Sequence, residues 1–433
     1  MATTFDDNTA PWLIDAPADE PAPPLDRDLE VDVAIIGGGF TGVSTAYHLS
    51  KQFPDRRIAL LEAKRLANGA SGRNGGLMLN GITVKDQDPD LMAREHAVTR
   101  GAIDAIEALI REHGLAVRIR RTGCLHISTT TRAAEEAHAR TEELAARGVP
   151  VKWVGKTALA VHGAVLDPTE GLLNGVDLIR AMRPLLVAQG VEIYEATPVM
   201  RVREGATIEL STPTHTVRAK AIVLATSGYT PRLGYFRTGV LPVISHVIGT
   251  DPVPPELLAR AGLDQVAGFF DDLPRLAYCS VDDDRRVVFG GGTTAAYGYR
   301  FGNATTYVTR DGDAATRALR QSLASYLPEL ATVPIRHRWS GPLDLTLARH
   351  CAMGVMGAHR NVYYALGYSG HGIVLANLAG RVLTDLYAGN HDPWRDCAFY
   401  MKQPSGIPPE PMRWVGYHLY TRLTGGSPWK RPA

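Results

Sequence analysis

The stretch Val31-Asp32-Val33-Ala34-Ile35-Ile36-Gly37-Gly38-Gly39-Phe40-Thr41-Gly42 decides the fold of this chain. Its apolar first half predicts a buried strand, and residues 43–49 after it predict a helix. In the turn between them, Gly37 permits a tight bend, Gly39 lets backbone N–H groups approach a pyrophosphate, and Gly42 lets the helix pack closely on the strand. The phosphates then lie at the positive end of the helix, with Phe40 and Thr41 beside them. The stretch therefore predicts the start of a dinucleotide-binding unit.

An acidic residue follows at the distance that a ribose partner requires. Residues 57–62 (Arg-Ile-Ala-Leu-Leu-Glu) predict the second strand, and its last residue, Glu62, comes 20 positions after Gly42. The carboxylate of Glu62 is placed to accept hydrogen bonds from an adenosine ribose, with Ala63 beside it. An ordinary glycine-rich turn, the alternative for the glycines alone, would not explain two strands, a helix and an acid in register.

The glycine fingerprint alone does not separate NAD from FAD, and the segment after the second strand discriminates between them better. Gly69-Ala70-Ser71-Gly72-Arg73-Asn74-Gly75-Gly76-Leu77 is rich in small residues and hydrogen-bond donors. Such a loop can run along a long dinucleotide and bring N–H groups to the phosphates and a flavin ring. A mobile surface loop, the alternative, gives no reason to place Arg73 and Asn74 among so many glycines. The sequence therefore favours FAD.

These segments resemble the FAD-dependent D-amino-acid oxidase superfamily, and within it the branch of the gamma-glutamylputrescine oxidoreductase-like and glycine- and sarcosine-oxidase-like proteins. Residues 219–229 are similar to a second FAD-contacting strand of the superfamily, and they end in Thr226-Ser227-Gly228. Residues 361–373 are similar to the element that closes the flavin site, with its contacts at Gly367, Ser369, Gly370, His371, Gly372 and Ile373. In relatives, the backbone of the residue that matches Val199 meets the adenine. A helix that starts at Gly372 would stabilise the negative charge that grows on a flavin as it is reduced.

The resemblance covers residues 31–386 and implies an α/β protein. We expect a discontinuous Rossmann-like FAD-binding domain and a second, α+β substrate domain built on an antiparallel sheet, with strands at 123–128, 241–250 and 286–291. The expected division is a 1–30 N-terminal arm, an FAD-binding domain of 31–80, 160–235 and 335–400, a substrate domain of 81–159 and 236–334, and a 401–433 tail. The aromatic residues of the tail are expected to pack onto the body or onto a neighbouring subunit.

Members of the superfamily move a hydride from a carbon next to nitrogen to the flavin, so the flavin carries the chemistry. A neutral amine needs no nucleophile, which explains why we find no Ser-His-Asp or Cys-His pattern. His371 is the best candidate for a catalytic role beside the flavin, although a histidine that only caps the helix is equally compatible. Arg73 and Asn74 are candidates for contact with flavin or substrate. Further candidates for the substrate side, equally compatible with core or surface positions, are Tyr297, Tyr299, Arg300, Trp339 and His246.

The resemblance implies FAD-dependent oxidation of the C–N bond of an amine or amino acid, with gamma-glutamylputrescine as the leading kind of substrate. The alternatives are a D-amino-acid dehydrogenase that uses an acceptor other than oxygen, a flavin tailoring enzyme of specialised metabolism, and a flavoprotein that binds FAD structurally or modifies tRNA. Sarcosine-oxidase relatives have a lysine above the flavin, at a position where this chain has Val288 or Phe289. They have a second lysine at the position of Val374 in this chain. The electron acceptor, oxygen or another, therefore stays open.

Composition excludes several other classes. With 433 residues we expect two domains, and a net charge of +1 argues against a nucleic-acid partner. No apolar run approaches the ~20 residues of a transmembrane segment, and residues 1–30 are acidic and proline-rich without the apolar core of a signal peptide. We therefore expect a cytoplasmic enzyme. Arg413, Arg422, Lys430 and Arg431 leave a membrane-surface role for the tail as a minor alternative.

The cysteines and histidines indicate neither disulfides nor metal. Cys124, Cys279, Cys351 and Cys397 are scattered and form no Cys-x-x-Cys pair, so we expect reduced thiols. Some relatives attach FAD through a cysteine; Cys351 lies in that neighbourhood, but our alignment puts the attachment point nearer Gly341, so we expect non-covalent FAD. No histidine spacing predicts a metal site. A homo-oligomer is left open.

Overall fold

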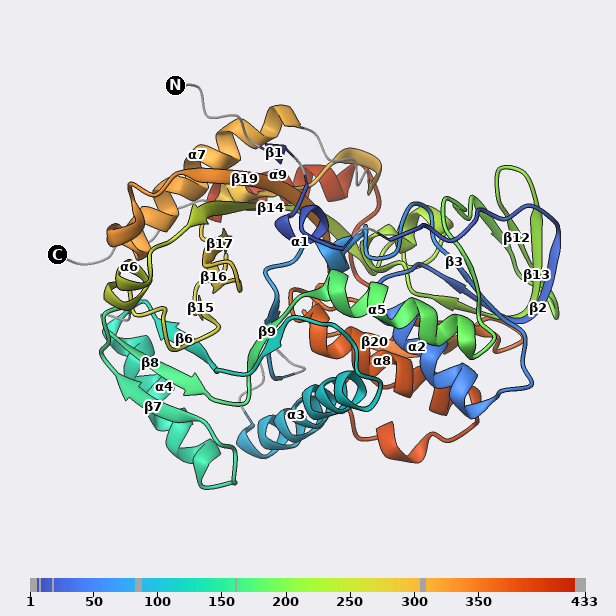
Figure 1. Cartoon of the computed structure of the whole chain (residues 1–433), viewed down its shortest axis with the longest axis horizontal. Helices are drawn as coiled ribbons and strands as arrows, with labels where there is room; N and C mark the ends of the chain where they lie inside the picture. Colours follow the sequence, from blue (N-terminus) through green and yellow to red (C-terminus); the bar gives the residue numbers. More distant parts are fainter. Residues whose placement is uncertain are drawn as a thin grey trace.

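The computed structural model describes residues 6–7, 9–17, 19–81, 88–159, 162–303 and 309–424. Figure 1 shows a smaller sheet at the right, marked by β2, β3, β12 and β13, and a larger sheet at the left, marked by β14, β17 and β6. Helices α2, α5 and α8 accompany the smaller sheet. The mixed α/β architecture confirms the fold class predicted from the sequence.

The smaller sheet holds the predicted dinucleotide unit. Its order is β10-β3-β2-β13-β12-β11, and β21 joins it beside β13 and carries β20. The parallel strands are β2 (Leu29–Ile36), β3 (Ile58–Leu61), β10 (Glu192–Tyr194), β13 (Thr216–Leu224) and β21 (Val362–Leu366). The antiparallel strands are β11 (Arg201–Arg203), β12 (Ile208–Ser211) and β20 (Ala352–Met356).

Side-chain alternation along β2 explains how this sheet is covered on both faces. Val33 and Ile35 point into the core cluster formed with the helices, and Ala34 and Ile36 point into a second cluster on the opposite face. The helices are α2 (Phe40–Gln52), α5 (Gly175–Ala188) and α8 (Gly372–Tyr387). Helices α2 and α8 approach so closely that a Cβ on Gly380 would lie 2.4 Å from the backbone carbon of Ser44.

The larger sheet is mainly antiparallel, as the sequence predicted for the second domain. Its order is β1-β19-β14-β17-β16-β15-β6-β8-β7. The strands are β1 (Asp6–Asp7), β19 (Ile335–Leu345), β14 (Leu241–Pro252), β17 (Arg286–Gly290), β16 (Tyr278–Val281), β15 (Gly268–Asp271), β6 (Cys124–Ser128), β8 (Gly163–Asp167) and β7 (Lys152–Gly155), with β18 (Tyr297–Gly298) on β14. The predicted strands at 123–128, 241–250 and 286–291 are all present.

Helices cover one face of the larger sheet and leave the other face toward the smaller sheet. Leu319 and Leu323 of α7 (Thr309–Tyr326) pack with Ile248 and Phe289 in one buried cluster, joined by α6 (Pro255–Arg260). Helix α4 (Thr131–Ala145) lies beside β6–β8, and α3 (Pro89–Glu112) contacts α4 and α8. We call the uncovered face, which meets the smaller sheet's loops, the inner face.

Two strands pair with a different sheet from the one that the expected domain boundaries would give them. Strands β8 and β19, which fall in segments expected for the FAD-binding domain, pair within the larger sheet. A small sheet of β4 (Leu77–Met78), β9 (Gly171–Leu173) and β5 (Ile119–Arg120) connects the two parts of the molecule. The division into two domains stays a prediction, and residues 160 and 161, at one expected boundary, lie outside the described residues.

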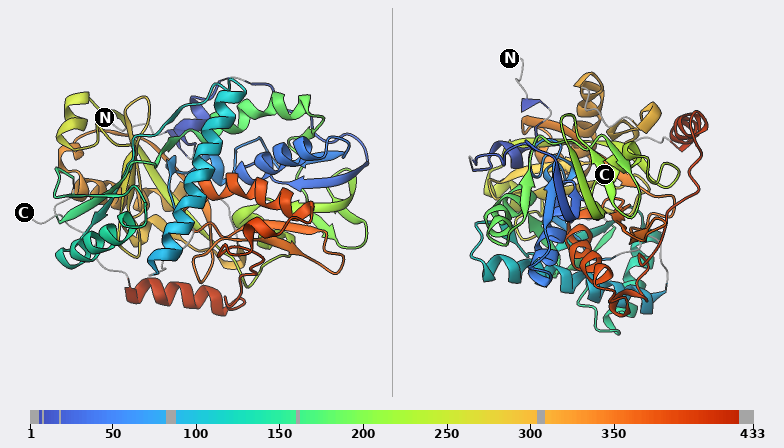
Figure 2. Two further views of the ribbon diagram at one scale, coloured as in Figure 1. Left: turned by 90° about the horizontal axis from the view of Figure 1, so that it is seen from below. Right: turned by 90° about the vertical axis from the view of Figure 1, so that its right-hand side faces the viewer.

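The two ends of the chain lie against the body to different extents. In the N-terminal arm, α1 (Pro11–Ile14) buries Trp12. In the tail, α9 (Met412–Thr424) lies on the outside of the molecule (Figure 2). Tyr417 packs on Tyr299 as expected, with ring centroids 5.6 Å apart, whereas Trp414 and Tyr420 are 40% and 57% exposed and do not pack onto the body. Packing of these rings onto a neighbouring subunit stays a prediction, and Lys430 and Arg431 lie outside the described residues.

Across the described ranges, no helix has both the length and the apolar character that crossing a bilayer requires.

Candidate active site

The turn between β2 and α2 needs glycine for two separate reasons. Gly37 has φ +111°, and a Cβ there would lie 2.4 Å from the carbonyl oxygen of Ala225 on the neighbouring strand end. A Cβ on Gly42 would lie 1.9 Å from the carbonyl oxygen of Gly37, so helix and strand touch through their backbones. Gly39 is the N-cap of α2 and has no side chain to cap it, and Phe40 N donates to Ser71 Oγ at 3.0 Å. The helix N-terminus thus presents its donors toward residues 69–77.

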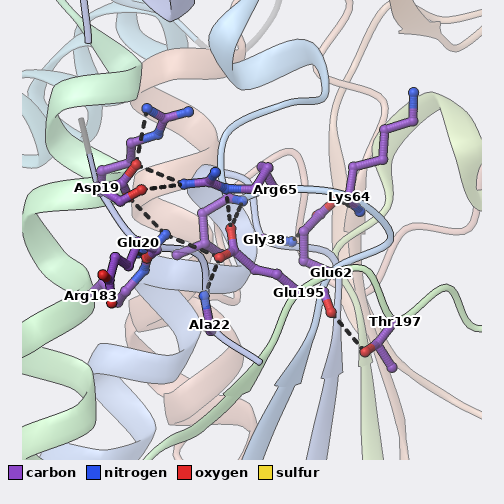
Figure 3. A network of polar contacts seen from close by, with 12 residues as sticks. Asp19, Glu20, Ala22, Gly38, Glu62, Lys64, Arg65, Arg183, Glu195 and Thr197 are labelled. Atoms are coloured by element: carbon purple, nitrogen blue, oxygen red, sulfur yellow. Dashed lines mark hydrogen bonds and ion pairs between the residues drawn. The ribbon is translucent and has the colours of Figure 1, made fainter. Parts of the chain in front are cut away.

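Glu62 follows β3 directly and lies against the glycine turn. Its Oε2 accepts from Gly38 N at 2.8 Å and its Oε1 accepts from Lys64 N at 2.9 Å (Figure 3). Burial raises the pKa of Glu62, although the backbone N–H groups of Gly38 and Lys64 oppose this. The carboxylate is therefore fixed at the strand end where a ribose partner was predicted.

A second acid, Glu195, was not singled out by the sequence. It follows β10, whose Tyr194 pairs with Leu61 of β3, so Glu195 and Glu62 leave neighbouring parallel strands at the same edge. Glu195 is buried and accepts from Leu66 N at 2.5 Å and from Ala22 N at 2.5 Å (Figure 3).

Charged side chains extend this contact into a network that ties down the N-terminal arm. Arg183 of α5 bridges Glu195 at 3.2 Å and Asp19 at 2.9 Å, and Arg65 reaches Asp19 at 2.7 Å (Figure 3). The network therefore holds the start of the 66–77 segment between β10, α5 and the arm. An acid at the end of a parallel strand was the available sequence signal for Glu195.

The loop of residues 69–77 is shaped by its own predicted contact residues. Arg73 Nε donates to Asn68 O at 3.0 Å and Arg73 Nη1 donates to Ser340 O at 3.0 Å. Asn74 Nδ2 donates to Ser71 O at 2.8 Å, and Asn74 Oδ1 accepts from Gly76 N at 2.9 Å. Both side chains thus fix the conformation of the loop, which includes the turn Ala70–Gly72. Gly69, Gly75 and Leu77 belong to the same loop. Their predicted catalytic role stays a prediction.

Two indole rings clamp this loop from opposite elements. Trp339 Nε1 of β19 donates to Arg73 O at 2.9 Å, and Trp12 Nε1 of α1 donates to Asn74 O at 2.9 Å. Both tryptophans are buried. Trp339, which the sequence left open between core and substrate side, therefore acts as a loop anchor.

The predicted C-terminal element reaches the same place. Tyr368 Oη lies 2.6 Å from Thr41 Oγ1, which joins the 367–373 turn to the first turn of α2. Gly367 N donates to Asp344 Oδ2 at 2.7 Å, and burial raises the pKa of Asp344 to about 6. Ser369 has φ +51°, so the chain turns sharply before Gly370 and α8. The turn is fixed by contacts from α2 and β19.

His371 occupies the N-cap position of α8 without capping it by a side-chain hydrogen bond. Its Nδ1 is shielded from solvent and, within the described part of the chain, has no hydrogen-bond partner. Burial, with a smaller effect of the charge on His126, lowers the pKa of His371 to about 4, so the imidazole is neutral at pH 7. Ile373 and Gly372 follow in the helix. The helix-capping alternative for His371 thus has no support from its contacts, and its catalytic role stays a prediction.

The remaining predicted cofactor residues lie at the same strand ends. Thr226-Ser227-Gly228 follow β13, and a Cβ on Gly228 would lie 3.3 Å from Pro342 Cβ of β19. Val199 comes two residues after Thr197, whose N donates to Glu62 O at 2.8 Å, and it packs on the core cluster beneath β2. The segments around 37–42, 62, 69–77, 226–228 and 367–373 therefore converge at the carboxyl ends of parallel strands, where ligands bind in open α/β sheets.

The inner face of the larger sheet roofs this convergence. Residues paired across its strands form one row, which runs Trp339, Val247, Gly290, Tyr278, Phe270, His126. A Cβ on Gly75 would lie 2.8 Å from the Tyr278 ring, and Ser280 Oγ donates to Gly75 O at 2.5 Å, so the sheet rests directly on the 69–77 loop.

The other substrate-side candidates have varied positions. Tyr297 Oη donates to Leu276 O at 3.3 Å, and Tyr299 donates to Glu410 of the tail. Tyr299 is thus tied to the tail rather than to the 69–77 loop. His246 is half-buried on β14 opposite Ser340, and Arg300 follows Tyr299 in the same connection. The roles of these residues stay predictions.

The residues fit a dinucleotide with a flavin. The glycine turn and the N-terminus of α2, whose N-cap Gly39 has no side chain, follow β2, and the turn that carries His371 follows the parallel strand β21. The Nδ1 atom of His371 is shielded and has no hydrogen-bond partner among the described residues. All four cysteines are free, and Cys351 is buried, which raises the pKa of its thiol. Over the described ranges, no group of three or more His, Cys, Asp or Glu side chains could hold a metal ion.

Comparison with known proteins agrees with this geometry. The chain is 27% identical over 389 residues to gamma-glutamylputrescine oxidoreductase of Escherichia coli (strain K12), with 84% of this chain and 85% of that protein covered. It is 24% identical over 375 residues to glycine oxidase of Geobacillus kaustophilus (strain HTA426), covering 82% of this chain and 92% of that protein.

Solved structures share the fold. Glycine oxidase from Geobacillus kaustophilus superposes with a TM-score of 0.72 at 22% identity, covering 87% of this chain and 100% of that one. L-proline dehydrogenase from P. horikoshii gives 0.66 at 19% identity, covering 84% and 94%. A sequence model of the FAD dependent oxidoreductase family (DAO) matches residues 32–386. The chain belongs to this family of FAD-dependent oxidoreductases.

Proposed function

We propose that this enzyme oxidises the carbon–nitrogen bond of an amine or amino acid with FAD, and that the imine formed is hydrolysed. The observation that carries the proposal is the convergence of five segments at the strand ends of the smaller sheet, beneath the inner face of the larger one. Gamma-glutamylputrescine oxidoreductase and glycine oxidase, which are similar along most of their length, support a nitrogen-bearing substrate.

The proposal assigns parts of the cofactor to parts of the chain. The glycine turn and the N-terminus of α2 would hold the pyrophosphate, and Glu62 the ribose. The 69–77 loop and the N-terminus of α8 would hold the flavin. When bound, FAD supplies the hydride acceptor for the carbon next to nitrogen.

The chain's own residues would position the substrate and exclude water. With the flavin held as proposed, the N-terminus of α8 would provide partial positive charge for the negative charge that develops on reduction. His371 beside it is neutral because burial lowers its pKa to about 4, so the helix provides this stabilisation without a full cation. Tyr278 and Phe270 give the inner face an aromatic surface opposite the loop. A site lined in this way would hold an amine in its neutral, hydride-donating form.

Two finer points belong to the same proposal. The name of the Escherichia coli relative supports a substrate like gamma-glutamylputrescine. Val288, one of the two positions where the resemblance leads us to expect a lysine, lies on the inner face and is fully buried, as is Val374 in α8. The absence of a cation at these positions favours an electron acceptor other than oxygen, as in the D-amino-acid dehydrogenase alternative. Burial of Cys351 supports non-covalent FAD.

Anaerobic reduction of the holoenzyme tests the proposal. We expect a panel of amines and amino acids, including gamma-glutamylputrescine, to contain a compound that bleaches the flavin absorbance near ~450 nm. Admission of air then separates the acceptors: slow or absent return of the colour indicates a dehydrogenase, and fast return indicates an oxidase. A protein that carries FAD and that no amine or amino acid bleaches would contradict the proposal.

A further inference from the structure

One half-buried histidine on the inner face is paired with a buried carboxylate, and the proposed function has not used this pair. Leu125 and Ile127 of β6 point into the core beneath α7, so His126 between them points to the inner face. It stands at the end of the row that contains Tyr278, and its ring lies 4.2 Å from that of Phe270, centroid to centroid. His126 is therefore part of the surface that roofs the flavin loop.

The partner of His126 is a carboxylate that has no contact with water. Glu170, in the turn between β8 and β9, is fully buried and lies 2.9 Å from His126 Nε2 through Oε2. Its Oε1 accepts from Asn80 N at 2.7 Å. A buried carboxylate is energetically costly unless hydrogen-bond donors satisfy it. The Glu170 carboxylate therefore favours a proton on Nε2 of His126, which makes this nitrogen a hydrogen-bond donor. The other ring nitrogen, Nδ1, makes no hydrogen bond within the described chain, and the side chain remains 34% exposed.

The charges around this pair favour a protonated ring. Burial opposes the charged imidazole, but the Glu170 carboxylate, and more weakly Asp167, raise the pKa of His126. Burial also raises the pKa of Glu170, and two donors hold its ionised form. Asp167 has its own partner, His96, at 2.7 Å, so it does not compete for His126. His371, the N-cap residue of α8, also faces His126, and it is neutral at pH 7 because burial lowers its pKa to about 4.

Two guanidinium groups, one in the 69–77 loop and one in β5, donate to backbone oxygens. Arg73 donates to Asn68 O and Ser340 O, and Arg120 donates to Val281 O. The imidazolium of His126 would offer a charged donor to an anionic group of a substrate under the inner face. A carboxylate accepts such a charge-assisted hydrogen bond readily.

We propose that His126 binds a carboxylate of the substrate through Nδ1–H, with Glu170 as the residue that positions the ring and keeps it charged. The inference rests on the proposed function and narrows its substrate to nitrogen compounds that carry a carboxylate, which are amino acids and their derivatives. His126 would be the specificity-determining residue, with the neutral His371 beside the proposed flavin position.

Binding of simple carboxylates to the oxidised holoenzyme tests this without turnover. Propionate and benzoate are titrated from pH 6 to 9, the change in the flavin spectrum reports binding, and propionamide is the uncharged control. We expect both anions to bind more tightly at pH 6 than at pH 9, and propionamide not to bind. His126→Gln should weaken propionate about tenfold to a hundredfold, the range of one charge-assisted hydrogen bond. His359→Gln, an exposed histidine in the β20–β21 turn, is the matched control and should change nothing.

Glu170→Gln separates contact from positioning. Loss of its charge lowers the pKa of His126, so we expect weak propionate binding at pH 8 that recovers toward pH 6, whereas His126→Gln stays weak at both. This shift of the binding midpoint is a readout that a purely structural role would not move. It also serves as the test if His126→Gln fails to retain FAD.

The outcomes separate this inference from the proposed function. Equal propionate binding by wild type and His126→Gln, or no carboxylate binding by FAD-loaded wild type at any pH, would overturn the carboxylate site. If methylamine, which has no carboxylate, reduces the flavin as fast as glycine and sarcosine, the carboxylate site is overturned. The proposed amine oxidation would still hold. Carboxylate binding that depends on His126, in a protein that no amine reduces, would support the site and refute the proposed reaction.

Discussion

Two glycines of the β2–α2 turn lie against atoms that differ in how easily they can move. Substitution of one should therefore affect cofactor binding, and substitution of the other should affect folding. A Cβ on Gly39 would lie 2.7 Å from Ser71 Oγ, the end of a side chain that can rotate away. A Cβ on Gly42 would lie 1.9 Å from the backbone oxygen of Gly37, which cannot move without separating helix and strand. The first contact is therefore tolerable in the folded chain, and the second is not.

We expect Gly39→Val to give a folded, colourless protein, since the added side chain blocks the backbone's approach to a pyrophosphate. Gly42→Val should instead lose several kcal/mol of stability and fail to accumulate as folded protein. The ratio of absorbance at ~450 nm to that at 280 nm and the far-UV circular dichroism of the two variants check this. Folded Gly39→Val with stoichiometric FAD would contradict the cofactor assignment.

At the same scale, sequence reasoning reached residues that act through local spacing and missed those that act through distant partners. Glu62 was found because a fixed number of residues separates it from the glycine turn. Glu195 bonds Ala22, which is 173 positions away, and Glu170 bonds His126, which is 44 positions away. Neither pair has a spacing that any motif encodes, because only the fold brings the two residues together.

The 69–77 loop depends on elements that come from opposite ends of the chain. Its carbonyl groups at Arg73 and Asn74 are held by the indole N–H groups of Trp339 in β19 and Trp12 in α1, each at 2.9 Å. Phenylalanine keeps an aromatic ring at the site and removes the N–H donor together with part of the ring volume. Each substitution therefore leaves one loop carbonyl without its partner, a buried one at Arg73 and a part-buried one at Asn74. An unsatisfied buried acceptor costs about 1–3 kcal/mol.

We predict that Trp339→Phe and Trp12→Phe each lower the free energy of unfolding by about 1–3 kcal/mol and weaken FAD binding. FAD affinity, measured by titration of the apoprotein, and denaturant unfolding check the two effects. Trp394→Phe is the matched control: Trp394 is also buried and donates to a side chain, that of Asp385, far from the loop. If all three variants lose stability and none of them loses affinity for FAD, the two tryptophans do not anchor the loop for FAD binding.

Periodicity identified most elements but not the sheets they join. The alternating residues of β6 and the apolar runs of β14 and β17 predicted strands at the right places. The pattern of Ile335–Leu345 is equally that of a strand, yet only its pairing with Leu241–Pro252 places it in the larger sheet. The tail shows the same limit, since its aromatic residues predict burial, whereas α9 turns Arg413 to the body and leaves Trp414 and Leu419 exposed.

At the scale of the whole molecule, one core joins the two sheets. The largest buried cluster contains Val33 and Ile35 of the smaller sheet together with Val247, Val288 and Trp339 of the larger sheet. The segments that surround the proposed FAD site are drawn from most of the chain's length. Loss of the inner-face contacts would therefore also expose this common core, and we expect the two sheets to unfold together.

This sharing predicts that release of FAD and loss of secondary structure occur in one transition. In denaturant, flavin fluorescence and far-UV circular dichroism should give the same midpoint, because the site cannot come apart while the common core stays packed. Added FAD should raise that midpoint by mass action, by about 2.7 kcal/mol of stability at a hundredfold excess over its dissociation constant. Gly39→Val provides the control, since its unfolding should not respond to added FAD. Release of FAD at a lower denaturant concentration than the change in circular dichroism would contradict this. It would show that the site opens as a separate unit and that the shared core does not couple the two sheets in unfolding.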